Sequence, residues 1–272
     1  MSAIASDNYI RLMLDGAASA AFDGLFFWAI EAAGPLTPFQ CLGGRVLIAL
    51  DGTQHFCSRK IKCRQCSSRR RSDGGTEYFL TFLGATLVAP GYKQVLLVRS
   101  EFIVPRDGAE KQDCERNTAK PWLARHSAAV GHLRPVYLGD DLFACQPIVA
   151  AIQDAGGHFI LPASRFLIRP EYLHGAELRE HRQTIYKRGK HTTTVYPRLS
   201  AVPLRATDDA ITANWFFIET FNDKRKRNYH NSFVTDLAVS ADTVAELAAC
   251  GRCAGEDRER DLQRPQDRRL QP

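Results

Sequence analysis

The sequence predicts an α/β protein with a mixed sheet and a β-rich addition, and two observations lead to this fold class. Between residues 45 and 161, short apolar runs alternate with helical patterns in the order strand, strand, strand, helix, strand, helix, strand. Residues 180–235 then change to β-rich segments separated by charged turns. We therefore expect helices flanking a mixed sheet, with an inserted or appended antiparallel sheet.

The first elements are a helical region and a buried strand. Residues 7–33 have helical character, and Ser6 or Asp7 can cap the start. The apolar run at 45–50 is short and is followed by Asp51-Gly52, which favours a buried strand that ends there.

A hairpin and a helix come next. The strand-like runs at 78–89 and 94–104 are separated by Pro90-Gly91, the composition of a hairpin turn. Residues 109–132 are polar and helical in character, and we expect Pro121 to kink or divide this helix.

The rest of the first half contains two strands and a helix. Residues 136–138 form a brief strand that ends at Gly139-Asp140-Asp141, and 142–155 form an amphipathic helix. A further strand begins at 158–161. Asp51 and Asp140 thus both follow strands, at the sheet ends where chemistry is common in α/β proteins.

The second half predicts an antiparallel sheet, a helix and a tail. We expect strands at 192–196, 213–221 and 229–234 and a helix from 242 to 249. Residues after Gly251 have no apolar periodicity, so we expect them to be disordered. The predicted divisions are a helical segment at 1–40, a first core part at 41–165, a β-rich insertion at 166–235, a return to the core at 236–252 and a disordered tail at 253–272.

Composition excludes several classes of protein. The 272 residues are 44% hydrophobic, which is enough for a core and excludes a disordered chain. No run approaches the roughly 18 apolar residues that span a bilayer, and the N-terminus lacks the pattern of a signal peptide. We therefore expect a cytoplasmic protein without a membrane partner, whose eight cysteines are thiols or metal ligands.

Positive charge is concentrated in short stretches. The net charge is only +6, but residues 59–71 hold seven basic residues and no acid, and 224–227 form a second basic run. Clustered cations suit a polyanion such as nucleic acid, because phosphate contacts dominate its affinity for proteins. The alternative is that both runs are solvated loops.

Asp51 and Asp140 form the first candidate site. Two carboxylates can bind Mg²⁺ through oxygen ligands, and a second metal would allow in-line attack on a phosphodiester. Both residues could instead be ordinary turn residues, since each lies in an Asp-Gly or Gly-Asp pair.

A Cys/His cluster forms the second candidate site. Cys63 and Cys66 have the C-x-x-C spacing of a zinc site, and His55 and Cys57 are near enough to complete four ligands. Zinc would hold in a fixed conformation the loop that presents cations to DNA. These cations are Arg59, Lys60, Lys62, Arg64, Arg69, Arg70 and Arg71. The alternative is a loop with free thiols.

Several sequence blocks resemble a known family. ALDGT at 49–53, TEYFLTFLGATLVAPG at 76–91, EFIVPRDGAEKQDCERNTAK at 101–120, RPVYLGDDLFACQP at 134–147 and NSFVTDLAVSADTVAELAACGR at 231–252 are similar to blocks of bacterial insertion-sequence DDE transposases. The similarity is strongest to the not-classified-yet group, near the long-insertion DDE type, and covers about residues 6–252.

The resemblance implies an RNase H-like fold with a β-rich insertion before the last catalytic helix. It also implies Mg²⁺-dependent nicking and strand transfer at the DNA ends of the element, with target DNA as partner and a homo-oligomer in an active relative. The first family aspartate falls on Asp51 and the second on Asp140, with Asp141 as the alternative.

The chain departs from the family where the third carboxylate is expected. The family helix continues as RWKIENETFNVLK, and its Glu completes the metal triad, whereas this chain reads CAGEDRERDLQRPQDRRLQP. Allowed codons for 256–272, read one base later, translate as KIENETFNVLKTAGYN, so we hypothesise a frameshift near Cys253 to Gly255. Glu256 and Glu259 lie nearby, but the sequence predicts no amphipathic helix to position them.

Two other segments also differ from the family. LPASRFLIR at 161–169 translates as TCKPVPHPT from allowed codons in another frame, close to a family CKP-x-S-H segment. SDNYIRLMLDG at 6–16 resembles an internal family block, so we expect a truncated copy. Ordinary divergence is the alternative for the two frame-dependent segments.

The sequence thus predicts a transposase that is inactive for lack of the catalytic Glu. A zinc-stabilised DNA-binding remnant without catalysis is the alternative, and a nuclease of another RNase H-like kind, such as a junction resolvase, is the third.

Overall fold

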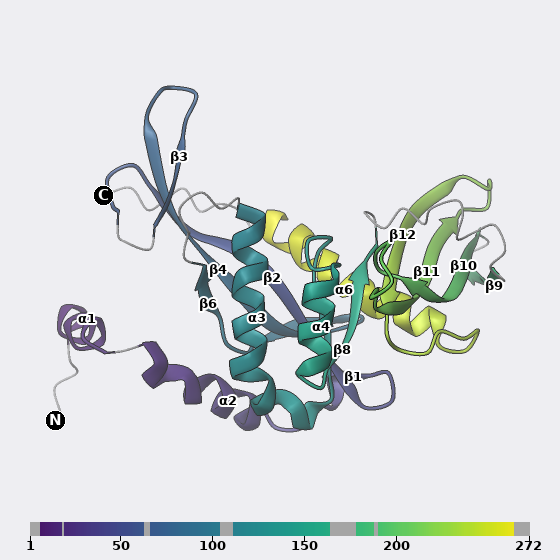
Figure 1. Ribbon diagram of the computed structural model, residues 1–272, viewed down its shortest axis with the longest axis horizontal. Coiled ribbons are helices and arrows are strands. Elements are labelled where there is room, and N and C mark those ends of the chain that lie inside the picture. The colour runs from purple at the N-terminus through teal and green to yellow at the C-terminus, as the bar shows by residue number, and fades with distance from the viewer. Residues whose placement is uncertain are drawn as a thin grey trace.

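One large mixed sheet with flanking helices organises the molecule, as predicted. The computed structural model describes residues 6–17, 19–62, 66–103, 111–163, 178–187 and 190–263. In this part of the chain a sheet of twelve strands follows the order β3-β4-β2-β7-β8-β12-β11-β10-β9, and β1, β5 and β6 pair beside that path. The predicted α/β class with a mixed sheet is confirmed (Figure 1).

Three parallel strands form the centre of the sheet. They are β2 (Arg45–Ser58), β7 (Pro135–Leu138) and β8 (His158–Pro162). Val46 to Ala49 pair with Pro135 to Leu138, and β8 continues the parallel order on the far side of β7. Val46 to Leu50 of β2 and most of β7 and β8 are apolar because both faces of the sheet are covered here.

Antiparallel strands extend the sheet from β2. β4 (Thr76–Ala89) pairs with β2 and turns into β5 (Tyr92–Leu97), which confirms the predicted hairpin. β6 (Glu101–Ile103), β3 (Ser67–Arg70) and β1 (Gln40–Cys41) are short additions.

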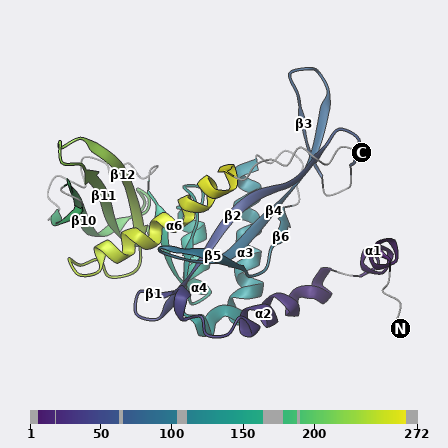
Figure 2. The same ribbon diagram turned by 180° about the vertical axis from the view of Figure 1, so that it is seen from behind.

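Helices cover the two faces of the central strands differently. α3 (Lys111–Val130) and α4 (Gln146–Asp154) cover the face that carries Ile48 and Leu50, and Pro121 lies within the continuous helix α3. α6 (Val244–Gln263) crosses the opposite face, which carries Leu47 and Ala49. Figures 1 and 2 show the two faces in turn, with α3 and α4 in front in the first and α6 in the second.

The β-rich insertion is a continuation of the central sheet. β9 (Arg179–Lys187), β10 (Lys190–Pro203), β11 (Thr212–Phe221) and β12 (Arg227–Thr235) are antiparallel neighbours, and β12 pairs with β8. Residues 233–235 of β12 pair with residues 160–162 of β8, and this pairing joins the insertion to the core.

Short helical elements precede and connect the strands. α1 (Asp7–Asp15) is capped by Ser6, whose Oγ accepts the Tyr9 N–H at 3.4 Å, and α2 (Asp23–Ala32) follows it. Turns of 3₁₀ helix lie at Ser19–Phe22, Thr37–Phe39 and Gly131–Leu133. No helix in the described ranges is both long and apolar enough to cross a membrane.

Two expectations about element boundaries are wrong. The strand expected to end at Leu50 continues through Asp51-Gly52 to Ser58, because β4 pairs with it as far as Tyr78. The helix expected to end near Ala249 continues to Gln263, well into the segment 253–272 that we expected to be disordered. Glu, Arg, Leu and Gln in that segment have good helix propensity even without apolar periodicity. Residues 164–177 and 264–272 lie outside the described ranges.

Candidate carboxylate site and basic arm

Asp51 and Asp140 lie just beyond the same pair of opposed residues on two adjacent parallel strands. Ala49 of β2 pairs with Leu138 of β7, and each aspartate lies two residues beyond its member of that pair. Neighbouring strands are about 4.8 Å apart, so the two backbones carry their carboxylates at the same end of adjacent strands. Asp51 lies within β2 and not after it, with Gly84 of β4 as its partner on the other side.

Strand alternation places Asp51 on the side of the sheet that α6 covers. Leu47 and Ala49 of β2 and Val136 and Leu138 of β7 pack in the core beneath α6. Because successive side chains of a strand alternate between faces, Asp51 continues the row of Leu47 and Ala49, and Asp140 follows the end of β7 by two residues. Both aspartates are half-buried, at the margin between that core and the solvent.

The backbone after β7 folds around Asp140. Its Oδ1 accepts the Leu142 N–H at 2.9 Å, and its carbonyl accepts the Phe143 N–H at 3.0 Å. Phe143 packs against Gly139, where a Cβ would lie 2.9 Å from the ring. The Asx turn that the sequence left as an alternative to a metal ligand is therefore present, and it fixes the carboxylate.

A third carboxylate, which sequence reasoning missed, supports the site from the opposite face. Glu115 of α3 is 6% exposed and packs on Gly52, where a Cβ would lie 2.5 Å from its Cδ. The next residue, Arg116, donates from Nε to the carbonyl of Leu142 at 2.9 Å. α3 thus contacts both segments that carry the aspartates, a tertiary contact with no signal in the sequence.

The side chains of α6 next to the aspartates are described only as far as Ala254. Val244, Leu247 and Gly251 face the sheet, and Gly251 lies directly on Phe233 and Ile160. Glu256 and Glu259 belong to the described helix backbone, whereas their side chains lie outside the described part. Among the described residues, no group of three or more His, Cys, Asp or Glu side chains is arranged to hold a metal ion. Metal binding by Asp51 and Asp140 therefore stays a prediction.

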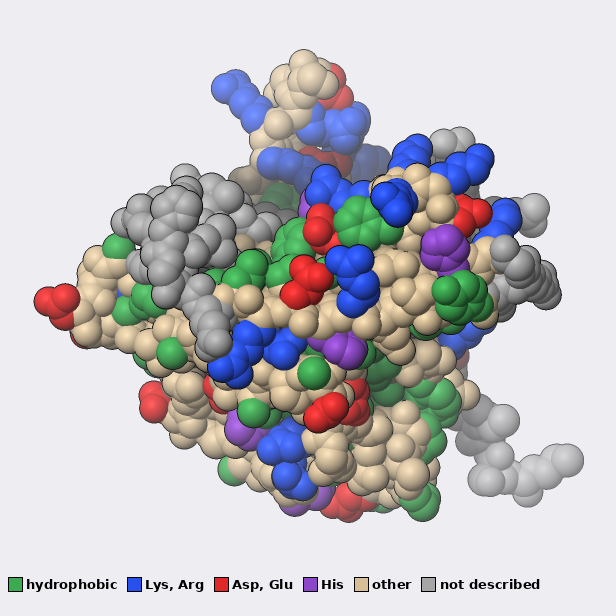
Figure 3. All heavy atoms as spheres, turned by 90° about the vertical axis from the view of Figure 1, so that its right-hand side faces the viewer, with side chains coloured by type: hydrophobic (Ala, Val, Ile, Leu, Met, Phe, Trp, Pro, Cys, Tyr) green, Lys and Arg blue, Asp and Glu red, His purple; other side chains and the backbone are tan. Residues whose placement is uncertain are grey.

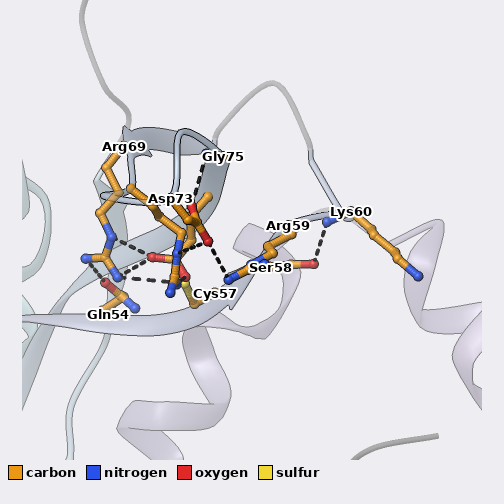
Figure 4. Close-up of polar contacts among 10 residues, drawn as sticks. Gln54, Cys57, Ser58, Arg59, Lys60, Arg69, Asp73 and Gly75 are labelled. Carbon is orange, nitrogen blue, oxygen red and sulfur yellow. Dashed lines mark hydrogen bonds and ion pairs between the residues drawn. The ribbon is translucent and has the colours of Figure 1, made fainter.

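The basic residues predicted to bind DNA lie on a projecting hairpin. We call residues 54–62 and 66–78 the basic arm; it consists of the outer parts of β2 and β4 with β3 along its edge, and it stands clear of the helices (Figure 1). Its acids neutralise some of its cations: Arg69 and Arg71 bind Glu77 at 2.6 and 2.9 Å, and Arg59 binds Asp73 at 3.1 Å (Figure 4).

Three cations of the arm remain available to a ligand. Lys60, Lys62 and Arg70 are exposed, and none of them forms an ion pair with an acid in the part of the chain that the structure describes. Arg64 lies outside the described residues. The arm therefore presents positive charge from its outer loop and from β3.

Glu77 forms ion pairs with two arginines of the arm. Hydrogen bonds from the Cys57 thiol and from Arg69 and Arg71 lower the pKa of its carboxyl group to about 2. The backbone N–H of Gly75, together with Arg59 and Arg71, likewise lowers the pKa of Asp73. Both groups are carboxylates at neutral pH, so these contacts hold β3 against β4.

The described members of the predicted zinc set make separate contacts. Cys57 lies beside Glu77 and Arg69, and desolvation together with Glu77 raises the pKa of its thiol. His55 lies at the bulge of β2 against Phe82, with ring centroids 5.9 Å apart, and lines a cavity of about 280 Å³ with Arg99 and Phe102. Cys66 is partly buried, and Cys63 lies outside the described residues, so zinc binding stays a prediction.

Comparison with known proteins gives weak structural likeness and no sequence match. No protein-family model and no curated protein matches the sequence. The fold is similar to the NurA nuclease from Sulfolobus solfataricus, at 12% sequence identity over 88% of this chain and 86% of that chain, with a TM-score of 0.29. A TM-score this low does not assign the chain to a fold family.

Proposed function

We propose that this chain is a degenerate DDE transposase with an RNase H-like core, whose Asp51 and Asp140 are two of the three metal-binding carboxylates. The observation that carries the proposal is their placement: each lies two residues beyond the paired residues Ala49 and Leu138 of adjacent parallel strands. The resemblance that suggested these residues used sequence blocks about 90 positions apart, so their placement near one end of adjacent strands supports the proposal.

The chemistry follows from the donor types. Carboxylate oxygens are the ligands that Mg²⁺ takes, and a metal held there would stabilise charge on a phosphodiester undergoing in-line attack. The Asx turn at Asp140 and the contact of Glu115 with Gly52 would hold the two carboxylates in place before metal binds. The third ligand of the family belongs on the helix that corresponds to α6.

The altered C-terminal segment would remove the third ligand. In the alternative reading frame, the first Glu of KIENETFNVLK falls at position 258, seven residues after Gly251. Seven residues are close to two helical turns, so this position lies on the same side of the α6 backbone as Gly251. The chain as it stands has Arg258 there, and a cation cannot serve as a metal ligand.

A DNA-binding remnant without catalysis is the second candidate function. The exposed cations of the basic arm favour it, since a hairpin with Lys60, Lys62 and Arg70 can contact phosphates whether or not the carboxylates hold metal. This candidate predicts DNA binding that weakens as the salt concentration rises, together with bound zinc. It also predicts that no variant nicks DNA, which distinguishes it from the transposase.

The proposal is tested by restoring the helix. The full chain and a variant that carries KIENETFNVLKTAGYN from position 256 are incubated with Mg²⁺ or Mn²⁺ and a plasmid that contains the locus and its flanking DNA. We expect no cleavage by the chain as it stands, and nicking by the restored variant that Asp51→Ala or Asp140→Ala abolishes.

Two results would count against this reasoning. Cleavage by the unaltered chain that Asp51→Ala abolishes would show that the third carboxylate is not missing. A well-folded restored variant that binds DNA but never cleaves it would favour the non-catalytic candidate. The nucleotide sequence of the locus, read in three frames, tests the frameshift separately.

A further inference from the structure

A polar groove on the insertion carries chemistry that the carboxylate site and the basic arm do not use. It has a volume of about 520 Å³ and lies across β9, β10 and the turn after β11. Its walls include Arg182, His191, Thr193, Phe221, Asn222 and Arg225. The groove therefore combines two guanidinium groups with neutral hydrogen-bonding side chains above an apolar floor.

The charges around this groove are weakly compensated. Arg182 pairs at 3.2 Å with Glu180, and both side chains are about half exposed, a type of pair that is readily exchanged for another anion. Arg225 has no ion pair among the described residues, and Lys224 and Lys226 flank it in the same turn. Asp223 is the acid of this turn, so the turn keeps a net positive charge.

The turn holds its cations on a fixed backbone. Asn222 Oδ1 accepts the N–H groups of Lys224 and Lys226 at 3.0 and 2.9 Å, and its backbone N–H donates to the Lys226 carbonyl at 3.0 Å. Arg225 adopts the left-handed conformation, with φ of 57°, at the apex. Pre-organised cations lose less conformational entropy when they bind an anion than cations on a flexible loop.

An exposed aromatic ring lies beside the same groove. Tyr186 of β9 is 79% exposed, and its ring lies 5.8 Å from that of His191, which lines the groove. Nucleic-acid surfaces place cations against phosphates, and those that bind single strands add aromatic rings on which unpaired bases stack. Acidic peptides would use the cations but have no need of the ring.

Strand directions place this groove at the same end of the sheet as the aspartates. β12 is antiparallel to β8, so its first residues lie at the end where β2, β7 and β8 carry their carboxyl termini. The turn between β11 and β12 and the start of β10 lie at that end too. The outer part of β2, in the basic arm, extends from the same end (Figure 1).

The surface seen from the insertion side agrees with this arrangement. Lys and Arg side chains gather along the upper part of that face, with the cations of the projecting hairpin behind them (Figure 3). β2 and β10 are five strands apart, which is about 24 Å across the sheet at 4.8 Å per strand, and the groove lies further along the strands than the end of β8. A duplex covers the distance across the sheet alone in about seven base pairs, at roughly 3.4 Å per pair, so a segment longer than this would reach the groove.

We propose that the groove and the turn at 224–226 form a second DNA-contacting surface, which binds the phosphodiester backbone of the DNA segment that extends away from Asp51 and Asp140. This inference rests on the proposed function, because it assigns a path to DNA held at the carboxylate site. DNA then runs from the basic arm, across the aspartates, to the insertion.

The experiment measures DNA binding by the full chain as fluorescence anisotropy of a labelled 30-base-pair duplex between 50 and 300 mM salt. The test variant combines Arg182→Gln with Arg225→Asn, since asparagine tolerates the left-handed conformation. The control variant removes the same charge through Lys93→Gln and Arg205→Gln, which lie on β5 and in the turn after β10, away from the groove.

We expect the test variant to bind at least about tenfold more weakly at 0.1 M salt, with a salt slope reduced by about two, and the control to bind like the unaltered chain. Equal binding by test and control variants overturns the inference and leaves the proposed function standing. If the unaltered chain binds no DNA, the proposed function fails as well. Binding of polyglutamate but not DNA at the groove would assign the surface to an acidic protein and also overturn the inference.

Discussion

Gly251 determines how closely α6 approaches the sheet that carries the aspartates. A Cβ at this position would lie 2.8 Å from Phe233 Cε1 and 3.1 Å from Ile160 Cγ2. Phe233 and Ile160 are fully buried, so neither can move aside without disturbing its own neighbours. Gly251→Ala therefore costs about 1–3 kcal/mol for overpacking and regains about 1 kcal/mol of helix propensity, a net loss of roughly 0–2 kcal/mol.

Gly24→Ala provides the matched control for this prediction. Gly24 also lies in a helix, α2, but nothing lies within 4 Å of the added Cβ. Only the propensity gain of up to about 1 kcal/mol applies there, so the two variants differ by roughly 1–3 kcal/mol. At about 2–4 °C per kcal/mol for a chain of this size, we expect their Tm values to differ by roughly 2–12 °C.

Thermal unfolding followed by circular dichroism at 222 nm measures this difference. A rise in Tm for Gly24→Ala with a fall or no change for Gly251→Ala supports the tight contact of α6 with β8 and β12. An equal rise in both variants would refute it, because α6 would then have room for a methyl group and could not position a ligand over the aspartates.

Three further predictions concern the carboxylates and the basic arm. Arg258→Glu should tighten Mn²⁺ binding measured by calorimetry by about tenfold or more, since glutamate supplies an anionic oxygen ligand at a position close to two helical turns after Gly251. Arg260→Glu, two positions on, should not, and equal effects would argue against the proposed ligand position. The pKa of Glu77 is lowered to about 2, so its ion pairs stabilise the arm above the unfolded pKa near 4.3 and are lost as the pH falls through about 2. Amide exchange in the arm should thus be faster for Glu77→Gln than for the unaltered chain at pH 6, and the two rates should converge near pH 2; a constant difference would contradict the ion-pair explanation. Lys60→Gln and Arg70→Gln should each reduce the salt slope of DNA binding by about one without changing Tm, and unchanged slopes would exclude these side chains from the interface.

Apolar strands and their order could be predicted because burial leaves a direct pattern in the sequence. The run at 45–50 and the strand at 136–138 are recognisable as buried strands, and they pair in parallel, although Asp51 lies inside β2 and not at its end. The insertion was also predictable as antiparallel, since its strands are separated by charged turns.

Features that depend on partners distant in sequence could not be predicted. Asp51-Gly52 has the composition of a turn, and only pairing with β4 keeps it in a strand. The burial of Glu115 against Gly52 requires the position of α3 over the sheet, which no local pattern encodes. The continuation of α6 beyond Ala254 has no apolar stripe to mark it.

The outermost strand of the insertion has a consequence for self-association. β9 ends the order of strands, so one side of its backbone has N–H and C=O groups that pair with no other strand among the residues that the structure describes. Such an edge is a template on which another chain can add a strand and start an aggregate. Arg179, Glu180 and Arg182 place alternating charges along β9, and a docking strand would have to bury them. The charge of this strand therefore protects the protein from edge-to-edge polymerisation.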